Sequence, residues 1–227
     1  ESGVAPADIA DLHFEIRDTK TDKVLNPSLF GFSIPDNVAP DIFRLAVYDR
    51  TISTYEQTPK LYSVKKVNGV YTTSPSLILV NTGKVSFGIT ATDRYTGSAN
   101  RNGIYEAILS ENGNPVTAFQ LDSISYDETR YLNAHIDYKL RSTGGAYIQH
   151  LSQLPGYANS IYKRITGDGV ITIDDDSIHP ISVEVKDANG NASILKFEIK
   201  RNPGFKGPVK NEQASPWQST EFHPGFI

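Results

Sequence analysis

Apolar and polar residues alternate along several short stretches of the chain, which is the pattern of strands with one buried face. In residues 12–17, for example, Leu12, Phe14 and Ile16 would share one face of a strand. The same reasoning predicts further strands at residues 42–48, 61–67, 69–73, 77–80, 85–92, 103–110, 116–121, 170–173, 181–185 and 194–199.

Turn residues separate these strands. Turns are predicted at 68–69, 112–115 and 189–191, each of which begins with Asn-Gly, and the first and the last favour positive φ and tight hairpins. The last pair is expected to join 181–185 to 194–199 as the final hairpin. Many short strands punctuated in this way indicate an antiparallel β-sandwich, so the predicted fold class is mainly β.

Residues 123–153 interrupt the strand pattern. Asp127 and Glu128 precede Tyr131 and Leu132, which predicts one or two helical turns capped by Asp127. We interpret this stretch as a short helical insertion across one edge of the sandwich.

Composition narrows the function classes. The 227-residue chain has a net charge of −4, which gives no reason to expect nucleic-acid binding. It contains no cysteine, which excludes a disulfide framework, a thiolate metal site and a cysteine nucleophile. No apolar run approaches the roughly 20 residues of a membrane span, so we expect none.

Two proline-containing segments suggest boundaries. Pro35 and Pro40 stiffen the stretch between 34 and 40. The tail after Arg201 is rich in proline and glycine, which predicts an extended linker over 202–227, leading to a downstream region. The absence of methionine suggests a removed leader or an internal piece of a longer protein. The expected organisation is a remnant at 1–34, a sandwich domain at 35–201 and this linker.

Residues 12–17, Leu-His-Phe-Glu-Ile-Arg, resemble the last strand of the lysostaphin/LytM-type zinc metallopeptidases, which cut peptidoglycan cross-bridges. The continuation through residue 31 is similar to the exit from their catalytic domain. The segments 101–105 and 126–131 are similar to the β-rich accessory region of longer Bacteroidetes-type members. The predicted strands 85–93 and 181–187 each end in an aspartate before a turn, and in this they resemble strands of Ig-like bacterial domains.

The resemblance implies roles for two residues. His13 matches the zinc-ligand histidine of the family, and Asp11 occupies the position of its catalytic histidine. The family's other two zinc ligands, a His-x-x-x-Asp pattern, have no counterpart here. Because catalytic zinc needs about three protein ligands, the chain alone is predicted to be inactive and to leave His13 vacant, with no cofactor of its own. Zinc is implied only for the full-length family.

The function that the resemblance implies is a non-catalytic, Ig-like accessory portion of an exported zinc metalloendopeptidase, in the periplasm or cell envelope. It would position or restrain the peptidase domain, with peptidoglycan or that domain as its partner. One alternative is a degenerate LytM-type activator of other wall hydrolases. Another is an Ig-like surface module that binds glycan or protein. Whether the full-length protein is an enzyme stays open.

Two carboxylate groups are candidates for a metal. The turn 187–191 with Asp174, Asp175 and Asp176 could offer oxygen ligands for calcium, although a plain hairpin turn is favoured. Asp8, Asp11 and Glu15 do not complete a coordination shell.

Two further groups have a functional and a structural interpretation. Asp127, Glu128, His135 and Asp137 could do acid–base work, but capping of a short helix and pairing with Arg130 is favoured. Aromatic side chains in and after the insertion could stack on sugars, although packing is favoured; they are Tyr126, Tyr131, Tyr138, Tyr147, Tyr157 and Tyr162.

Overall fold

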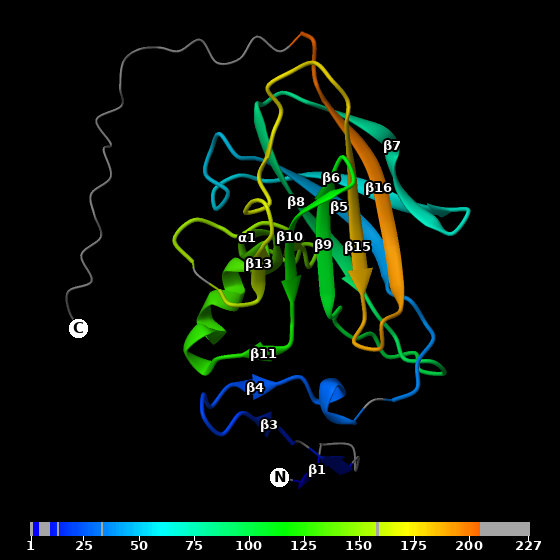
Figure 1. Cartoon of the computed structure of the whole chain (residues 1–227), viewed down its shortest axis with the longest axis vertical. Coiled ribbons are helices and arrows are strands. Elements are labelled where there is room, and N and C mark those ends of the chain that lie inside the picture. Colours follow the sequence, from blue (N-terminus) through cyan, green and yellow to red (C-terminus); the bar gives the residue numbers. More distant parts are fainter. Residues whose placement is uncertain (1, 5–9, 13, 33, 158, 205–227) are drawn as a thin grey trace, which may run out of the picture.

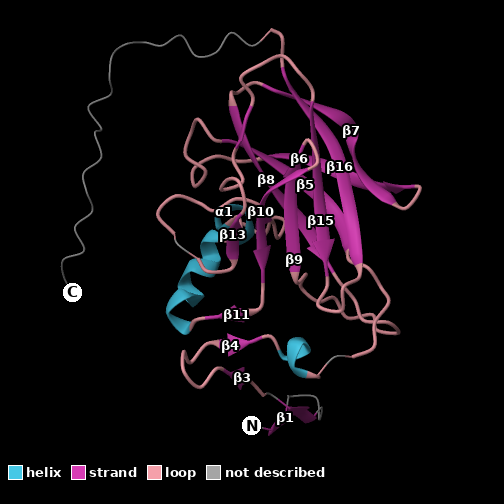
Figure 2. Cartoon of the chain, viewed as in Figure 1, coloured by secondary structure: helices cyan, strands magenta, loops and turns pink. Residues whose placement is uncertain are grey.

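The alternating segments form the strands of one large sheet. The computed structural model describes residues 2–4, 10–12, 14–32, 34–157 and 159–204. The sheet has eleven strands (Figures 1 and 2): β5 (Asp41–Asp49), β6 (Lys60–Val67), β7 (Val70–Val80), β8 (Lys84–Thr92), β9 (Glu106–Glu111), β10 (Asn114–Gln120), β12 (Gln149–His150), β13 (Tyr162–Arg164), β14 (Ile171–Thr172), β15 (His179–Lys186) and β16 (Ala192–Arg201).

The strand order is β12-β8-β5-β6-β7-β16-β15-β9-β10-β13, and β14 also pairs with β8. Neighbouring strands are antiparallel except β7 and β16, which are parallel. The chain is therefore mainly β, as predicted, but the sheet is mixed and the expectation of a purely antiparallel one is wrong. A parallel pair joins segments far apart in sequence, so local alternation cannot reveal it.

The sheet curls around one hydrophobic core. Phe87 on β8 and Phe197 on β16 are separated by three strands within the sheet, yet their ring centroids are 5.2 Å apart in an edge-to-face contact. Both rings belong to a single cluster of buried residues that draws on strands from both halves of the sheet. The two halves therefore face each other across a shared interior, as in a sandwich.

Strand directions decide which loops meet. Three antiparallel steps lead from β8 to β7, a parallel step leads to β16, and one antiparallel step leads to β15. β8 and β15 therefore run in the same direction, while β5 runs opposite to both. The residues that follow β8, those that follow β15 and those that precede β5 consequently lie at the same end of the sheet (Figure 1).

The predicted single strand over residues 12–17 is wrong. β2 (Ala10–Leu12) pairs with β1 (Ser2–Val4), whereas β3 (Ile16–Arg17) pairs with β4 (Val24–Leu25), and Phe14 and Glu15 between them lie in no strand. Because the two short strands have different partners, the alternation there does not describe one continuous ladder.

The N-terminal segment is held against the sandwich by backbone pairing. β4 pairs with β11 (Ser123–Ile124), which gives a three-stranded sheet β11-β4-β3. The first 3₁₀-helix, η1 (Pro27–Phe30), follows Asn26. The side chains of Leu29, Phe30 and Phe32 are exposed and not buried against the sandwich.

The insertion predicted between 123 and 153 is present. It contains the 3₁₀-helix η2 (Tyr126–Ala134) and the helix α1 (Tyr138–Ser142), both cyan in Figure 2. The cap differs from the prediction: Ser125, not Asp127, accepts hydrogen bonds from the first turn, with Oγ 3.3 Å from Asp127 N and the carbonyl 3.1 Å from Glu128 N.

The structure also differs from the prediction for the two strands between residues 69 and 80. The predicted strands 69–73 and 77–80 merge into one strand, β7, which begins at Val70 and whose pairing with β16 skips 73–76. Pro75 lies in that skipped stretch, where its missing N–H removes no ladder bond.

The predicted linker 202–227 lies outside the described residues from 205 onward. No helix among the described residues is long and apolar enough to cross a membrane.

The Asn-Gly turns allow a stability test. Asn112 and Gly113 have φ values of 51° and 79° in the β9–β10 hairpin, and a Cβ at Gly113 would meet open space. Gly113→Val should therefore lower the free energy of unfolding by about 1 kcal/mol or more through backbone strain alone. Gly103 also faces open space but has no positive φ, so Gly103→Val is the matched control. Equal losses in denaturant melts would contradict the argument.

Candidate functional site

The residues that carry the metallopeptidase resemblance cannot be placed as a site. His13 lies outside the described residues, and so does the side chain of Asp11, whose backbone pairs with Gly3. Asp8 is outside as well. Glu15 accepts hydrogen bonds from Arg17 Nε at 2.9 Å and from the Tyr126 hydroxyl at 3.0 Å. The assignment of a zinc ligand to His13 therefore stays a prediction.

The two halves of the predicted calcium candidate lie apart. Asp175 accepts from Ser177 and lies 3.1 Å from His179 Nε2, and Asp176 pairs with Arg201 at 2.9 Å. These residues precede β15, whereas Asp187 follows it, so a strand separates them. The predicted grouping of Asp187 with residues 174–176 is wrong.

Asp187 instead meets two other aspartates. One carboxylate oxygen from each of Asp36, Asp93 and Asp187 lies within 4.8 Å of the others. Asp93 follows β8, Asp187 follows β15 and Asp36 lies in the segment that leads into β5, so the strand directions bring all three to one end of the sheet. The sequence showed the two strand-ending aspartates but gave no signal for Asp36.

Backbone and side-chain donors hold two of these carboxylates. Asp36 Oδ1 accepts from Thr96 N and Thr96 Oγ1, both at 2.8 Å. Asp187 Oδ1 accepts from Asn189 N at 2.9 Å and Asn191 N at 2.8 Å, and Oδ2 accepts from Asn191 Nδ2 at 2.6 Å. The hairpin turn predicted at 189–190 therefore exists and also fixes the orientation of Asp187.

Burial raises the pKa of Asp93 to about 6, and the negative charges of Asp187 and Asp36 add to this effect. A cavity of about 250 Å³ adjoins the group and is lined in part by Asp93, Asn102, Asp187 and Asn189. The three carboxylates thus form an oxygen-rich cluster beside a small hollow, with Asp93 and Asp187 buried and Asp36 partly exposed. Asp36, Asp93 and Asp187 are called the aspartate cluster below.

The predicted acid–base group does not assemble. Asp127 is exposed on η2, and Glu128, which is partly buried there, accepts from Ser160 Oγ. His135 and Asp137 are buried. Asp137 accepts from the Tyr48 hydroxyl at 2.8 Å and caps α1 by accepting from Leu140 N. The predicted local pairing with Arg130 is also missing from the described ion pairs; this guanidinium lies over the ring of Tyr131 instead.

His135 belongs to a buried hydrogen-bond network. Its Nδ1 is 2.8 Å from the Tyr162 hydroxyl, which in turn donates to the His150 carbonyl at 3.0 Å. The single hydroxyl proton of Tyr162 is thereby used, so His135 carries its proton on Nδ1 and its Nε2 faces the Gln149 amide nitrogen at 3.3 Å. Both histidines are structural components of the interior.

Burial sets the charge state of this network. It lowers the pKa of His135 to about 3, with a smaller effect from His150, and lowers the pKa of His150 to about 4 against the opposing charge of Asp137. Burial also raises the pKa of the Tyr162 phenol. Both imidazoles and the Tyr162 phenol are therefore neutral at pH 7.

The predicted tyrosine platform is scattered. Tyr126 bonds to Glu15 and Arg17, and Tyr162 belongs to the buried network. Tyr157, however, contacts the rings of Tyr131 and Tyr55, at centroid distances of 5.7 and 5.9 Å. Tyr55, Tyr131 and Tyr157 are called the tyrosine group below. The sequence pattern did not indicate Tyr55, because it lies 76 positions before Tyr131.

A shallow hollow adjoins the tyrosine group. It has a volume of about 460 Å³ and is lined by Gln153, Leu154, Pro155, Gly156, Tyr157, Arg164 and Asp168. Arg164 Nε donates to Gln153 Oε1 at 3.1 Å, and the Tyr55 hydroxyl donates to the Pro155 carbonyl at 2.8 Å. Exposed rings beside amide and guanidinium groups are the surface chemistry that sugar rings contact.

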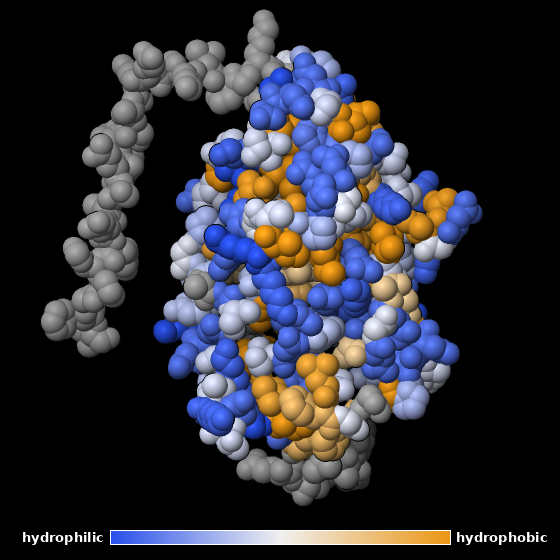
Figure 3. All heavy atoms as spheres, viewed as in Figure 1, coloured by the Kyte–Doolittle hydropathy of each residue, from blue (hydrophilic) through white to orange (hydrophobic). Residues whose placement is uncertain are grey.

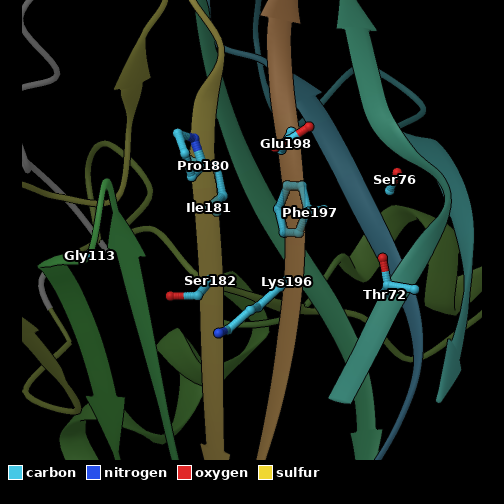
Figure 4. Close-up of a pocket in the computed structure, with 9 residues that line it drawn as sticks. All are labelled: Thr72, Ser76, Gly113, Pro180, Ile181, Ser182, Lys196, Phe197 and Glu198. Carbon is cyan, nitrogen blue, oxygen red and sulfur yellow. The ribbon is translucent and has the colours of Figure 1, made fainter. Parts of the chain in front are cut away.

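Another cavity, of about 480 Å³, lies over β7, β15 and β16 (Figure 4). Its charged lining residues are Lys196 and Glu198, both on β16, and Lys196 points toward Ser182 on the neighbouring strand. These two side chains are accompanied by hydroxyls and apolar groups, without a histidine or a second carboxylate in the lining. We therefore assign no function to this cavity.

No protein-family model, curated protein or solved structure matches the chain. The likeness to LytM-type metallopeptidases consequently rests on the sequence segments that carry it.

The buried histidines predict a pH dependence of stability. Below pH 6.5 the unfolded chain protonates His135 and His150 while the folded chain does not, so both lower the free energy of unfolding as the pH falls. Each contributes a slope of up to about 1.4 kcal/mol per pH unit. In denaturant melts between pH 6.5 and 5, His150→Gln should be less sensitive to pH than the wild type by about this amount.

The control for this test is His179. Its pKa is raised because hydrogen bonds to Glu111 and Asp175 outweigh the effect of burial, so its contribution to stability is complete below pH 6.5 and is lost as the pH rises above that value. His179→Gln should leave the slope between pH 6.5 and 5 unchanged. A slope in His150→Gln equal to that of the wild type would contradict the assignment.

Proposed function

We propose that the chain is a non-catalytic accessory module, an Ig-like β-sandwich of an exported cell-wall zinc metalloendopeptidase, and that it positions the peptidase domain before it. The observation that carries the proposal is the N-terminal segment, which is anchored to the sandwich and presents an exposed apolar patch. A module that only spaced two domains apart would need neither feature.

The anchor combines backbone and side-chain bonds. Asn26 N donates to the Asp122 carbonyl at 2.8 Å, and Asn26 Nδ2 donates to the Leu121 carbonyl at 3.2 Å. Further along, Arg17 Nη2 donates to the Tyr126 hydroxyl at 2.9 Å, and the Arg17 guanidinium lies 4.7 Å from the centre of that ring. The segment is thus fixed at two separate places, which limits its rotation relative to the sandwich.

The patch consists of Phe14, Phe30 and Phe32, which are 49%, 50% and 57% exposed. The rings of Phe14 and Phe32 lie 5.2 Å apart, and hydrophobic atoms gather at this end of the molecule in Figure 3. Full burial of an exposed side chain of this size contributes about 1.5–3 kcal/mol, and these half-exposed rings forgo about half of that. Together they are suited to contact a domain that precedes residue 14 in the chain.

The chemistry of the described histidines supports a non-catalytic role. His135 and His150 are buried with lowered pKa values, and His179 is paired with Glu111 and Asp175. None of these three lies in the aspartate cluster. A metallopeptidase centre would require several ligands around one open site, so catalysis is assigned to the preceding domain and not to this chain.

A second candidate function is glycan binding, favoured by the tyrosine group and its adjoining hollow. The ring of Tyr157 contacts those of Tyr55 and Tyr131, and the exposed rings of Tyr55 and Tyr157 offer a stacking surface, while Arg164 and Gln153 supply polar groups. This is compatible with the accessory role, because a wall-binding surface would also position the peptidase. A degenerate LytM-type activator would use the same surfaces without a metal centre upstream.

The apolar patch can be tested in the full-length protein. The double variant Phe30→Ser, Phe32→Ser should slow peptidoglycan cleavage by about tenfold to a hundredfold, because a misplaced catalytic domain loses its alignment with substrate. The free energy of unfolding should change by no more than about 0.5 kcal/mol, since both side chains are exposed. The measurements are turbidity loss of purified cell walls and denaturant melts.

Ile52→Ser is the control for the patch, because Ile52 is as exposed as Phe32 but lies in the β5–β6 loop. It should leave both measurements unchanged. Equal cleavage rates in the patch variant and the wild type would refute the positioning role, as would the absence of a peptidase domain before the chain.

The tyrosine group makes a separate prediction about binding. Tyr157→Ala should weaken co-sedimentation of the chain with purified peptidoglycan by about two- to tenfold, since a ring contact contributes about 0.5–1.5 kcal/mol. Tyr147→Ala removes an exposed ring outside the group and should bind like the wild type. If the wild-type chain does not sediment with peptidoglycan, the glycan-binding candidate is wrong.

A further inference from the structure

Three segments far apart in sequence place carboxylates at one point. The aspartate cluster draws on the segment before β5, the end of β8 and the end of β15, and its three ligand oxygens lie within 4.8 Å of one another. A calcium ion binds oxygens at about 2.3–2.6 Å, so two ligands on opposite sides of the ion are separated by about twice that distance. The spacing of the cluster fits around such an ion.

Two oxygens of the cluster have no partner. Asp93 Oδ1 and Asp36 Oδ2 are both buried, and neither accepts a hydrogen bond from any described residue. Asp93 is only 5% exposed. Buried polar oxygens normally have a donor, and leaving a charged one without compensation is costly. These two oxygens are therefore available to a ligand that carries positive charge.

The surrounding side chains do not supply that charge. Arg94 follows Asp93 directly, but its guanidinium pairs with Asp41 at 3.1 Å. The ion pairs of the described residues include none to Asp36, Asp93 or Asp187. Three acidic groups thus face one another, and no cationic side chain among the described residues is paired with them.

We propose that Asp36, Asp93 and Asp187 bind one calcium ion. The ligand atoms are all hard carboxylate oxygens without histidine or cysteine, a set that suits calcium or magnesium and not zinc. Calcium is favoured over magnesium because the carboxylates come from three fixed chain segments, and calcium accepts irregular oxygen shells whereas magnesium demands a near-ideal octahedron. Water from the adjoining hollow completes the shell.

Such an ion would join the N-terminal segment to the sandwich. Asn189 Nδ2 already donates to the Ile34 carbonyl at 2.7 Å, and Asn191 Nδ2 donates to the Asp36 carbonyl at 3.2 Å. Calcium would add a charged link between the same segment and the ends of β8 and β15. This inference rests on the aspartate cluster and is independent of the proposed function.

The experiment uses the purified chain after dialysis against a chelator. Adding calcium should raise the Tm of the wild type, and metal analysis should find one calcium per chain. Asp93→Asn should lose this shift, while its Tm in chelator equals or exceeds that of the wild type, because the substitution removes a buried charge. A preserved Tm in chelator shows that the variant is folded, so a lost response reports on binding.

The control is Asp174→Asn, which removes an exposed carboxylate elsewhere with the same change of charge; it should keep the full calcium shift. Hydrogen exchange gives a second readout: calcium should slow exchange at the amides of Asn37 and Val38 in the wild type but not in Asp93→Asn. The proposal is overturned if the wild type shows no calcium shift, if Asp93→Asn retains it, if magnesium gives an equal one, or if zinc occupies the site.

Discussion

The parallel pairing of β16 with β7 is the constraint on which the architecture depends. β5, β6, β7 and β8 form one antiparallel run, and β15, β9, β10 and β13 form another. β16 is hydrogen-bonded to β7 on one side and to β15 on the other, so it joins the two runs into one sheet. Only when they are joined can Phe87 of the first run pack against Phe197 at the junction.

The parallel pairing of β16 with β7 also determines which carboxylates lie close together. Had β16 paired antiparallel with β7, β15 would run opposite to β8, and Asp187 would lie at the other end of the sheet from Asp93. The parallel step places both strand ends on the same side as the entry to β5, which brings Asp36 to them. The aspartate cluster is therefore a consequence of topology and not of any local motif.

That distinction explains what the sequence could predict. Alternation and Asn-Gly pairs are local signals, so the main strands, the turn at 112–113 and the hairpins at 68–69 and 189–190 were predicted correctly. The edge strands β12 and β13 contain two and three residues, too few to produce a period. The sequence also showed that Asp93 and Asp187 end similar strands. It could not show that they meet, because that depends on pairing between residues more than 100 positions apart.

The two buried polar clusters differ in how their hydrogen-bonding needs are met. Around His135, ring nitrogens, a phenol, an amide and a carbonyl pair as neutral donors and acceptors, and the unpartnered atom nearby is the uncharged Nδ1 of His150. Such an atom costs about 1–3 kcal/mol. In the aspartate cluster the unpartnered atoms belong to carboxylates, for which the penalty is larger, and no neutral rearrangement of neighbours supplies a counter-charge. The first cluster is held by neutral hydrogen bonds, whereas the proposed calcium ion would balance the charge of the second.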